Sequence, residues 1–225
     1  MSTRSSRTGA RVPTRPRSPR VIGIDLAGST HRDSGVCLLE GPRRVRAQVL
    51  HSDAELREFV RSAQPDLVVI DAPLSLPRGR RTIENRSGPH LRECDRTLLR
   101  LRLPFFPLTL GPMRMLTVRG MRLARYLTRD GTTVVEGYPG GSQDLWGIPR
   151  KKAGVTGLQR RLRALGLGGD LARRPLTHDE LDAVTIAWVG WNHLKGEGVL
   201  IGDPSEGVML LPRTHEFELR SAARE

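Results

Sequence analysis

The chain has 225 residues and a formal net charge of +13, with 37 lysine and arginine residues against 24 aspartate and glutamate residues. This length suits one domain with a full hydrophobic core, and the basic composition excludes an acidic disordered chain. No apolar run is long enough to span a membrane and no apolar signal segment is visible, so we expect a cytoplasmic protein. Cys37 and Cys94 are the only cysteines, which argues against a disulfide framework and a zinc cluster.

Hydrophobic periodicity predicts an alternation of strands and helices. In chain order, we expect strands at 21–28, 35–41 and 43–51, a helix at 53–63, a strand at 66–74, helices at 91–102 and 117–130, a strand at 132–141, helices at 157–167 and 178–194, and a hairpin at 199–212. The first three strands form an antiparallel meander, and the later strand–helix–strand units are parallel crossovers. The predicted fold class is therefore α/β, a mixed sheet with an antiparallel three-strand meander, then parallel strands, and helices on both faces.

Positive charge is concentrated in two segments. Residues 1–20 contain six arginines and no acid, together with prolines and serines, and are predicted to be a disordered basic tail. Residues 78–129 contain thirteen arginines against three acids, within a predicted helical, arginine-rich insert at about 75–130. Such a segment favours a polyanionic partner. Because the whole chain prefers arginine to lysine, only the clustering of these residues is informative, and their identity is not.

Within the insert, Arg92, Arg96 and Arg100 have the spacing of one helical face and are predicted to bind nucleic acid. The triplet Arg150, Lys151 and Lys152 is a second candidate contact with phosphate groups. Most charged triplets are simply solvated surface, so that interpretation stays open for the second group.

Acidic residues end three of the predicted strands: Asp25, Asp71 and Glu136. The carboxyl ends of parallel strands meet at one edge of a sheet, where open α/β sheets bind ligands. Asp179 and Asp182 are three residues apart on the predicted late helix and share a face. Clustered carboxylates repel one another unless a cation lies between them, and oxygen ligands favour Mg²⁺ or Mn²⁺. Any one of these acids could be a turn or cap residue, but together they predict a metal site.

These motifs resemble the DUF429 family, whose members are described as predicted nucleases with an RNase H-like fold. The resemblance lies in GIDLAGS (23–29), IDAPLSLP (70–77), RECDR (92–96), EGYPGG (136–141), HDELDA (178–183) and GDPSEGVMLLP (202–212). It implies an RNase H-like domain at 21–212, followed by a polar C-terminal tail at 213–225. It also implies that Asp25, Asp71 and Asp182 occupy the positions of metal-binding acids in that fold. RNase H itself takes a further acid from its first helix, and the substitute here is Glu136.

Two smaller signals accompany the acids. The turn after the first strand resembles a phosphate-binding loop, in which Gly28 and Ser29 would hold a phosphate, although a plain tight turn has the same composition. His178 precedes the late-helix acids and is either a proton-transfer group or a helix-cap residue.

The resulting prediction is a metal-dependent nuclease or phosphodiesterase that acts on DNA or RNA with Mg²⁺ or Mn²⁺. Its catalytic residues would be Asp25, Asp71, Glu136 and Asp182, and its metal ligands Asp25, Asp71, Asp179 and Asp182. One alternative is a phosphoryl-transfer enzyme of the actin-like ATPase or sugar-kinase type, which needs two lobes and a second glycine-rich phosphate loop. Another is a non-catalytic nucleic-acid-binding protein with a decayed site. The sequence leaves the oligomeric state undefined.

Overall fold

A computed structural model describes residues 18–85, 87–148 and 154–223. In these ranges one mixed sheet contains β1 (Val21–Asp25), β2 (Ser34–Leu39), β3 (Val45–Leu50), β4 (Leu67–Asp71), β5 (Val134–Gly137), β6 (Gly198–Asp203) and β7 (Gly207–Pro212). The helices are α1 (Asp53–Ala63), α2 (Glu93–Arg100), α3 (Gly111–Arg129), α4 (Pro139–Leu145), α5 (Gly154–Ala164), α6 (Asp170–Arg173), α7 (His178–His193) and α8 (His215–Ala222).

The seven strands follow the order β3-β2-β1-β4-β5-β7-β6. The meander β1–β2–β3 is antiparallel, whereas β1, β4, β5 and β7 run parallel to one another and β6 returns antiparallel to β7. An antiparallel meander beside parallel crossover strands is the predicted RNase H-like arrangement, and the fold prediction is confirmed. Parallel crossovers bring the carboxyl ends of β1 and β4 side by side at one edge.

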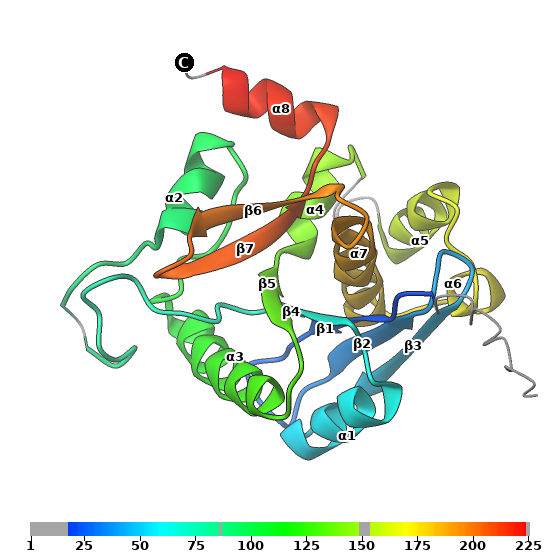
Figure 1. Cartoon of the computed structure of the whole chain (residues 1–225), viewed down its shortest axis with the longest axis horizontal. Coiled ribbons are helices and arrows are strands. Elements are labelled where there is room, and N and C mark those ends of the chain that lie inside the picture. Colours follow the sequence, from blue (N-terminus) through cyan, green and yellow to red (C-terminus); the bar gives the residue numbers. More distant parts are fainter. Residues whose placement is uncertain (1–17, 86, 149–153, 224–225) are drawn as a thin grey trace, which may run out of the picture.

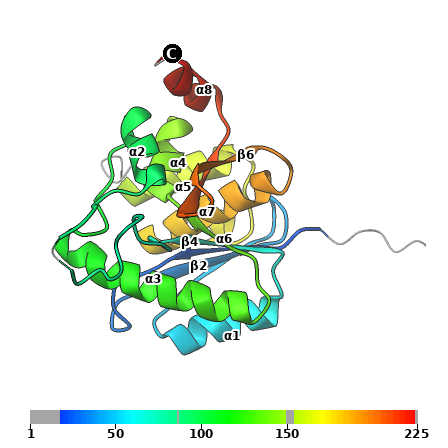
Figure 2. The same cartoon turned by 60° about the vertical axis from the view of Figure 1, so that its left-hand side comes forward.

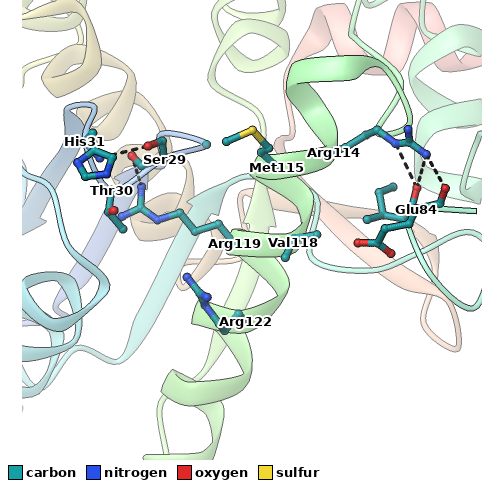
Figure 3. A pocket seen from close by; sticks show the side chains of 11 residues that line it. Ser29, Thr30, His31, Glu84, Arg114, Met115, Val118, Arg119 and Arg122 are labelled. Atoms are coloured by element: carbon teal, nitrogen blue, oxygen red, sulfur yellow. Dashed lines mark hydrogen bonds between the residues drawn. The ribbon is translucent and has the colours of Figure 1, made fainter.

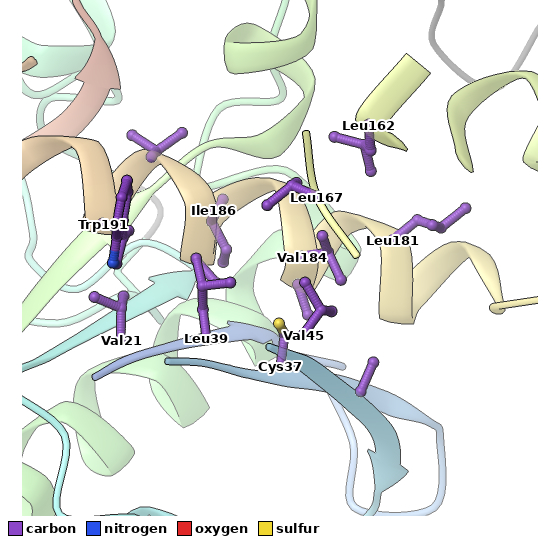
Figure 4. Close-up of a cluster of buried hydrophobic side chains, with 14 of the residues drawn as sticks. Val21, Cys37, Leu39, Val45, Leu162, Leu167, Leu181, Val184, Ile186 and Trp191 are labelled. Carbon is purple, nitrogen blue, oxygen red and sulfur yellow. The ribbon is translucent and has the colours of Figure 1, made fainter. Parts of the chain in front are cut away.

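Helices cover both faces of the sheet (Figures 1 and 2). On one face, α7 packs against β1 and β2, and its apolar side chains interdigitate with Val21, Cys37 and Leu39 (Figure 4). On the other face, α1 and α3 bury a second apolar cluster against β1 and β4. A third cluster joins α2 and α8 to the β6–β7 hairpin. Because each strand alternates its side chains between the two cores, one residue of register decides which face a side chain reaches.

Several helices differ from the sequence-based prediction, which had no helix at α6 and placed the start of α5 three residues later than it is. Helix α3 begins at Gly111 and not at residue 117, because Pro112 is in its first turn, where the missing N–H costs nothing. The strand predicted at 132–141 ends at Gly137, and its glycine-rich end begins α4, which likewise has Pro139 in its first turn. The predicted polar tail contains α8, where Thr214 caps the helix and Phe217 is buried.

The predicted tail at residues 1–20 lies almost wholly outside the described residues. Across the described ranges, every helix is too short or too polar to cross a membrane.

Replacing Gly35 with alanine should destabilise the fold and displace the start of α7. The added Cβ would lie 2.0 Å from the carbonyl oxygen of Asp179 and 2.7 Å from the amide nitrogen of Glu180. Backbone atoms cannot move aside as a flexible side chain can, and overpacking typically costs about 1–3 kcal/mol. At Gly111 an added Cβ meets no atom within 4 Å, so Gly111→Ala should change the unfolding free energy by less than about 0.5 kcal/mol. Urea denaturation compares the two variants, and equal stability would contradict the close approach of α7.

Candidate active site

A cavity of about 360 Å³ lies where the first turn of α7 approaches the carboxyl ends of β1 and β4. Asp25 ends β1 and Asp71 ends β4, and the two residues are register partners on adjacent parallel strands. Asp179 and Asp182 reach the same cavity from α7. The structure therefore brings four of the five predicted acids to one place, as the strand-end and late-helix spacing indicates.

The side chain of Asp182 is held in a fixed orientation. Its Oδ1 accepts a hydrogen bond from Nε2 of Gln143 at 2.7 Å, and its Oδ2 lies 3.2 Å from Nδ1 of His178. Gln143 is buried and also contacts Thr185 Oγ1 at 3.3 Å. The sequence does not predict a role for Gln143, because no helix is expected at 139–145. The one available signal was the proline before the glycine pair, which marks a helix start.

The donors in this cavity suit a hard divalent cation, because they are carboxylate oxygens without any thiolate. Within the described part of the chain, however, no group of three or more His, Cys, Asp or Glu side chains is placed so that it could hold a metal ion. The structure thus contains the ligand chemistry in one cavity, with both oxygens of Asp182 engaged by neighbouring side chains.

A scan of protein families matches residues 23–206 to the family described as "Protein of unknown function (DUF429)". This chain belongs to the DUF429 family. The matched range includes every residue that lines the carboxylate cavity. The same family resemblance is apparent in the sequence motifs that carry these acids.

Comparison of the DUF429 chain with curated proteins finds no match. Among solved structures, it is similar to T. thermophilus RuvC in complex with a Holliday junction substrate, at 14% identity and a TM-score of 0.48. It is also similar to a second structure of Thermus thermophilus RuvC, at 17% identity and a TM-score of 0.40. Each alignment covers 79% of this chain and 96% of the other chain.

In the DUF429 chain, Glu136 is not among the residues that line the carboxylate cavity, although it lines a small neighbouring cavity together with Asp71. It is the register partner of Ile70, one residue before Asp71, so its side chain points to the opposite face of the sheet. There it is buried, and Arg92 donates to both of its oxygens at 2.6 and 2.7 Å. Burial raises the pKa of the Glu136 carboxyl above its ordinary value, while the Arg92 guanidinium acts in the opposite direction. The position equivalent to Asp71 on this strand is Gly137.

The predicted basic face of the insert is only partly exposed. Arg92 is 2% exposed and forms ion pairs with Asp95 and Glu136, so the prediction that it binds nucleic acid is wrong. It precedes α2 as the N-cap residue, whereas Arg96 and Arg100 lie on the helix, about half exposed and paired with Glu93. The predicted contacts Arg150, Lys151 and Lys152 lie outside the described residues.

The loop after β1, which contains the predicted phosphate-binding residues Gly28 and Ser29, is fixed by Arg119. This buried side chain donates to the carbonyl oxygen of Ser29 at 3.0 Å (Figure 3). It also donates to the carbonyl oxygen of Ala27 at 2.7 Å and forms an ion pair with Asp53 at 2.8 Å. Arg119 belongs to the basic insert and fastens this loop of the DUF429 domain to α3. The insert therefore supports the loop that lines the candidate site, in addition to contributing positive charge at the surface.

A second cavity, of about 630 Å³, adjoins the carboxylate cavity. The two share Gly28, Ser29 and Met115 as lining residues. Arg114 and Arg122 project from α3 along the larger cavity, as Figure 3 shows. The two cavities are therefore neighbours, with the four acids in the lining of one and Arg114, Arg119 and Arg122 in the lining of the other, and we call them together the cleft.

Proposed function

We propose that this protein is a metal-dependent nuclease or phosphodiesterase that acts on nucleic acid. The observation that supports this most directly is the convergence of Asp25, Asp71, Asp179 and Asp182 on one cavity at the carboxyl edge of the parallel strands. Four acids at a sheet edge are costly by mutual repulsion, and a divalent cation removes that cost. The family and the fold are compatible with this activity, but the site is what carries the argument.

Asp25, Asp71 and Asp182 would hold a Mg²⁺ or Mn²⁺ ion, with Asp179 beside them. This requires their carboxylates to move closer together, because the described side chains form no metal-binding group of three or more. Such an ion supplies neutralisation of the phosphodiester charge and activation of water. Gln143 positions Asp182 through its 2.7 Å hydrogen bond. Holding a carboxylate by hydrogen bonds from a neighbouring buried side chain is the usual means of orienting a ligand.

The arginine-lined part of the cleft would bind the anionic backbone of the substrate. Arg32 lines the carboxylate cavity, and Arg114 and Arg122 line the cavity next to it. Arginine is well suited to phosphate groups because its planar guanidinium presents several donors at once. The net positive charge of the insert supports the same partner. The phosphoryl-transfer alternative receives no support, because the described residues form a single sheet and not two lobes.

A panel of labelled single-stranded and duplex DNA and RNA tests this proposal. We expect cleavage with Mg²⁺ or Mn²⁺ and little or none with Ca²⁺, which takes more ligands at longer distances and positions the reactants less tightly. Excess EDTA should abolish the activity. Undiminished cleavage in EDTA would refute the metal-dependent mechanism, and binding without cleavage in every metal would favour the non-catalytic alternative.

A further inference from the structure

A third cavity, of about 170 Å³, lies directly beside the carboxylate cavity. The two share Asp71, Met113 and Leu116. A group bound in this small cavity would therefore be a neighbour of whatever the carboxylates hold. The inference below rests on the proposed function and concerns the form of nucleic acid that the site accepts.

The walls of the small cavity are aromatic and thioether side chains. Phe105 and Phe106 come from the segment between α2 and α3, Tyr138 from the end of β5, and Met209 from β7. Phe106 is 69% exposed, so its ring is accessible to a ligand that enters from solvent. With only four phenylalanines in the chain, the placement of two at this point concentrates the stacking surface beside Asp71.

The floor of the cavity is an ion network whose donors are fully used. The guanidinium of Arg92 makes five contacts, two each to Asp95 and Glu136 and one to Ser75. A guanidinium has five N–H groups, so none is left for a ligand. The cavity consequently offers faces for stacking but no guanidinium donor, and the polar groups left to a ligand are carboxylate acceptors.

The size and setting of the cavity fit a single flat ring. A cavity of about 150 Å³ with apolar walls holds one benzene molecule, so 170 Å³ is enough for a ring but not for a stacked pair. Stacking on aromatic side chains binds any base, since every base has a π face. The neighbouring cavity presents Arg114 and Arg122, which suit an anion. A nucleic-acid strand carries rings and phosphates at regular spacing, so it could place a ring in one cavity and a phosphate near the other.

We propose that this cavity holds one unstacked base of the substrate strand, next to the phosphodiester at the carboxylates. A base can enter only when it is unpaired, so the site selects single strands, loops or flipped-out nucleotides. Because the cavity holds a single ring, it favours a pyrimidine over a bicyclic purine at this position.

A scan with abasic residues tests the assignment. A labelled single strand is bound by the protein in Ca²⁺, and one abasic residue is moved along it position by position. For the wild type, we expect one position at which loss of the base weakens binding about tenfold. In Phe106→Ala the same abasic residue should cost nothing, because the stacking partner is already gone. Leu110→Ala is the matched control, since Leu110 is 49% exposed on the same segment but does not line the cavity.

The decisive quantity is the difference between the abasic penalty in the wild type and the abasic penalty in Phe106→Ala, as in a double-mutant cycle. An abasic penalty that is equal in wild type and Phe106→Ala at every position would overturn the base pocket while leaving cleavage and the proposed function intact. A penalty removed by Leu110→Ala as well would also overturn it. Failure of the intact single strand to bind at all would overturn the base pocket but not the proposed function, which the duplex substrates of the cleavage panel test separately. Replacement of a pyrimidine at the sensitive position by a purine should weaken binding more than replacement by the other pyrimidine, and equal affinity for all four bases would contradict a pocket for a single ring.

Discussion

Asp71→Asn should lower the metal-dependent cleavage rate at least about 100-fold. The substitution keeps the shape of the side chain but removes the charge beside Asp25, its register partner. Charge stabilisation by a catalytic ion is worth several kcal/mol, and each 1.36 kcal/mol corresponds to a factor of ten in rate. Single-turnover cleavage at saturating enzyme and Mn²⁺ measures the effect, and Mn²⁺ affinity should fall in parallel.

The matched control for this variant is Asp66→Asn. Asp66 lies just before the same strand at its opposite end, where it accepts a hydrogen bond from the backbone N–H of Arg20 at 2.7 Å. Its loss should leave the cleavage rate within about twofold of wild type, since surface changes away from a site have small effects. In the absence of metal, Asp71→Asn should melt no lower than the wild type, because like charges are separated. Equal Mn²⁺ affinity in Asp71→Asn and wild type would remove Asp71 from the site.

Arg92→Ala should reduce the unfolding free energy by about 3–5 kcal/mol. The substitution leaves Asp95 and Glu136 buried without the guanidinium that pairs with both, and breaking a buried ion pair from one side carries a penalty of this size. Glu136 also accepts the backbone N–H of Leu74 at 2.9 Å. The loop that follows Asp71 would therefore loosen together with the cluster.

Urea denaturation compares the unfolding free energies of Arg92→Ala and Arg96→Ala. The comparison distinguishes loss of the buried ion pairs from loss of one positive charge in general. Arg96 is about half exposed, so its removal should cost less than about 0.5 kcal/mol. The double variant Arg92→Met, Glu136→Gln should regain part of the lost stability, because it removes one uncompensated charge and fills the space. If Arg92→Ala and Arg96→Ala were equally stable, the buried cluster would contribute nothing to the fold.

The sequence predicted the sheet well because its strands are nearly continuous apolar runs separated by turn residues. The placement of Asp25 and Asp71 followed from that pattern, since both end such runs. Glu136 ends a run of the same appearance but is offset by one residue in register, which sends its side chain to the other core. Register between distant strands depends on how they pair, and a single strand does not encode it.

The spacing of the arginines predicted their positions less reliably than the apolar pattern predicted the strands. Helical spacing correctly grouped Arg96 and Arg100 on α2. It could not show that Arg92 lies before the helix and is buried. A buried arginine is rare unless it is paired. Its partner Glu136 is 44 residues away along the chain, so a local pattern cannot reveal the pair.

The carboxylate cavity is built from both ends of the domain. Asp25 lies on the first strand, whereas Asp179 and Asp182 lie on a helix near the end of the chain that packs directly onto β1 and β2. During synthesis on the ribosome, the first strand therefore exists for most of translation without the helix that completes the cavity. A nascent or truncated chain carries the basic segments that are proposed to bind nucleic acid, but it lacks the assembled acids. Under the proposed function, such a chain can hold RNA or DNA without cutting it, and competence arises only when the last third of the chain has folded.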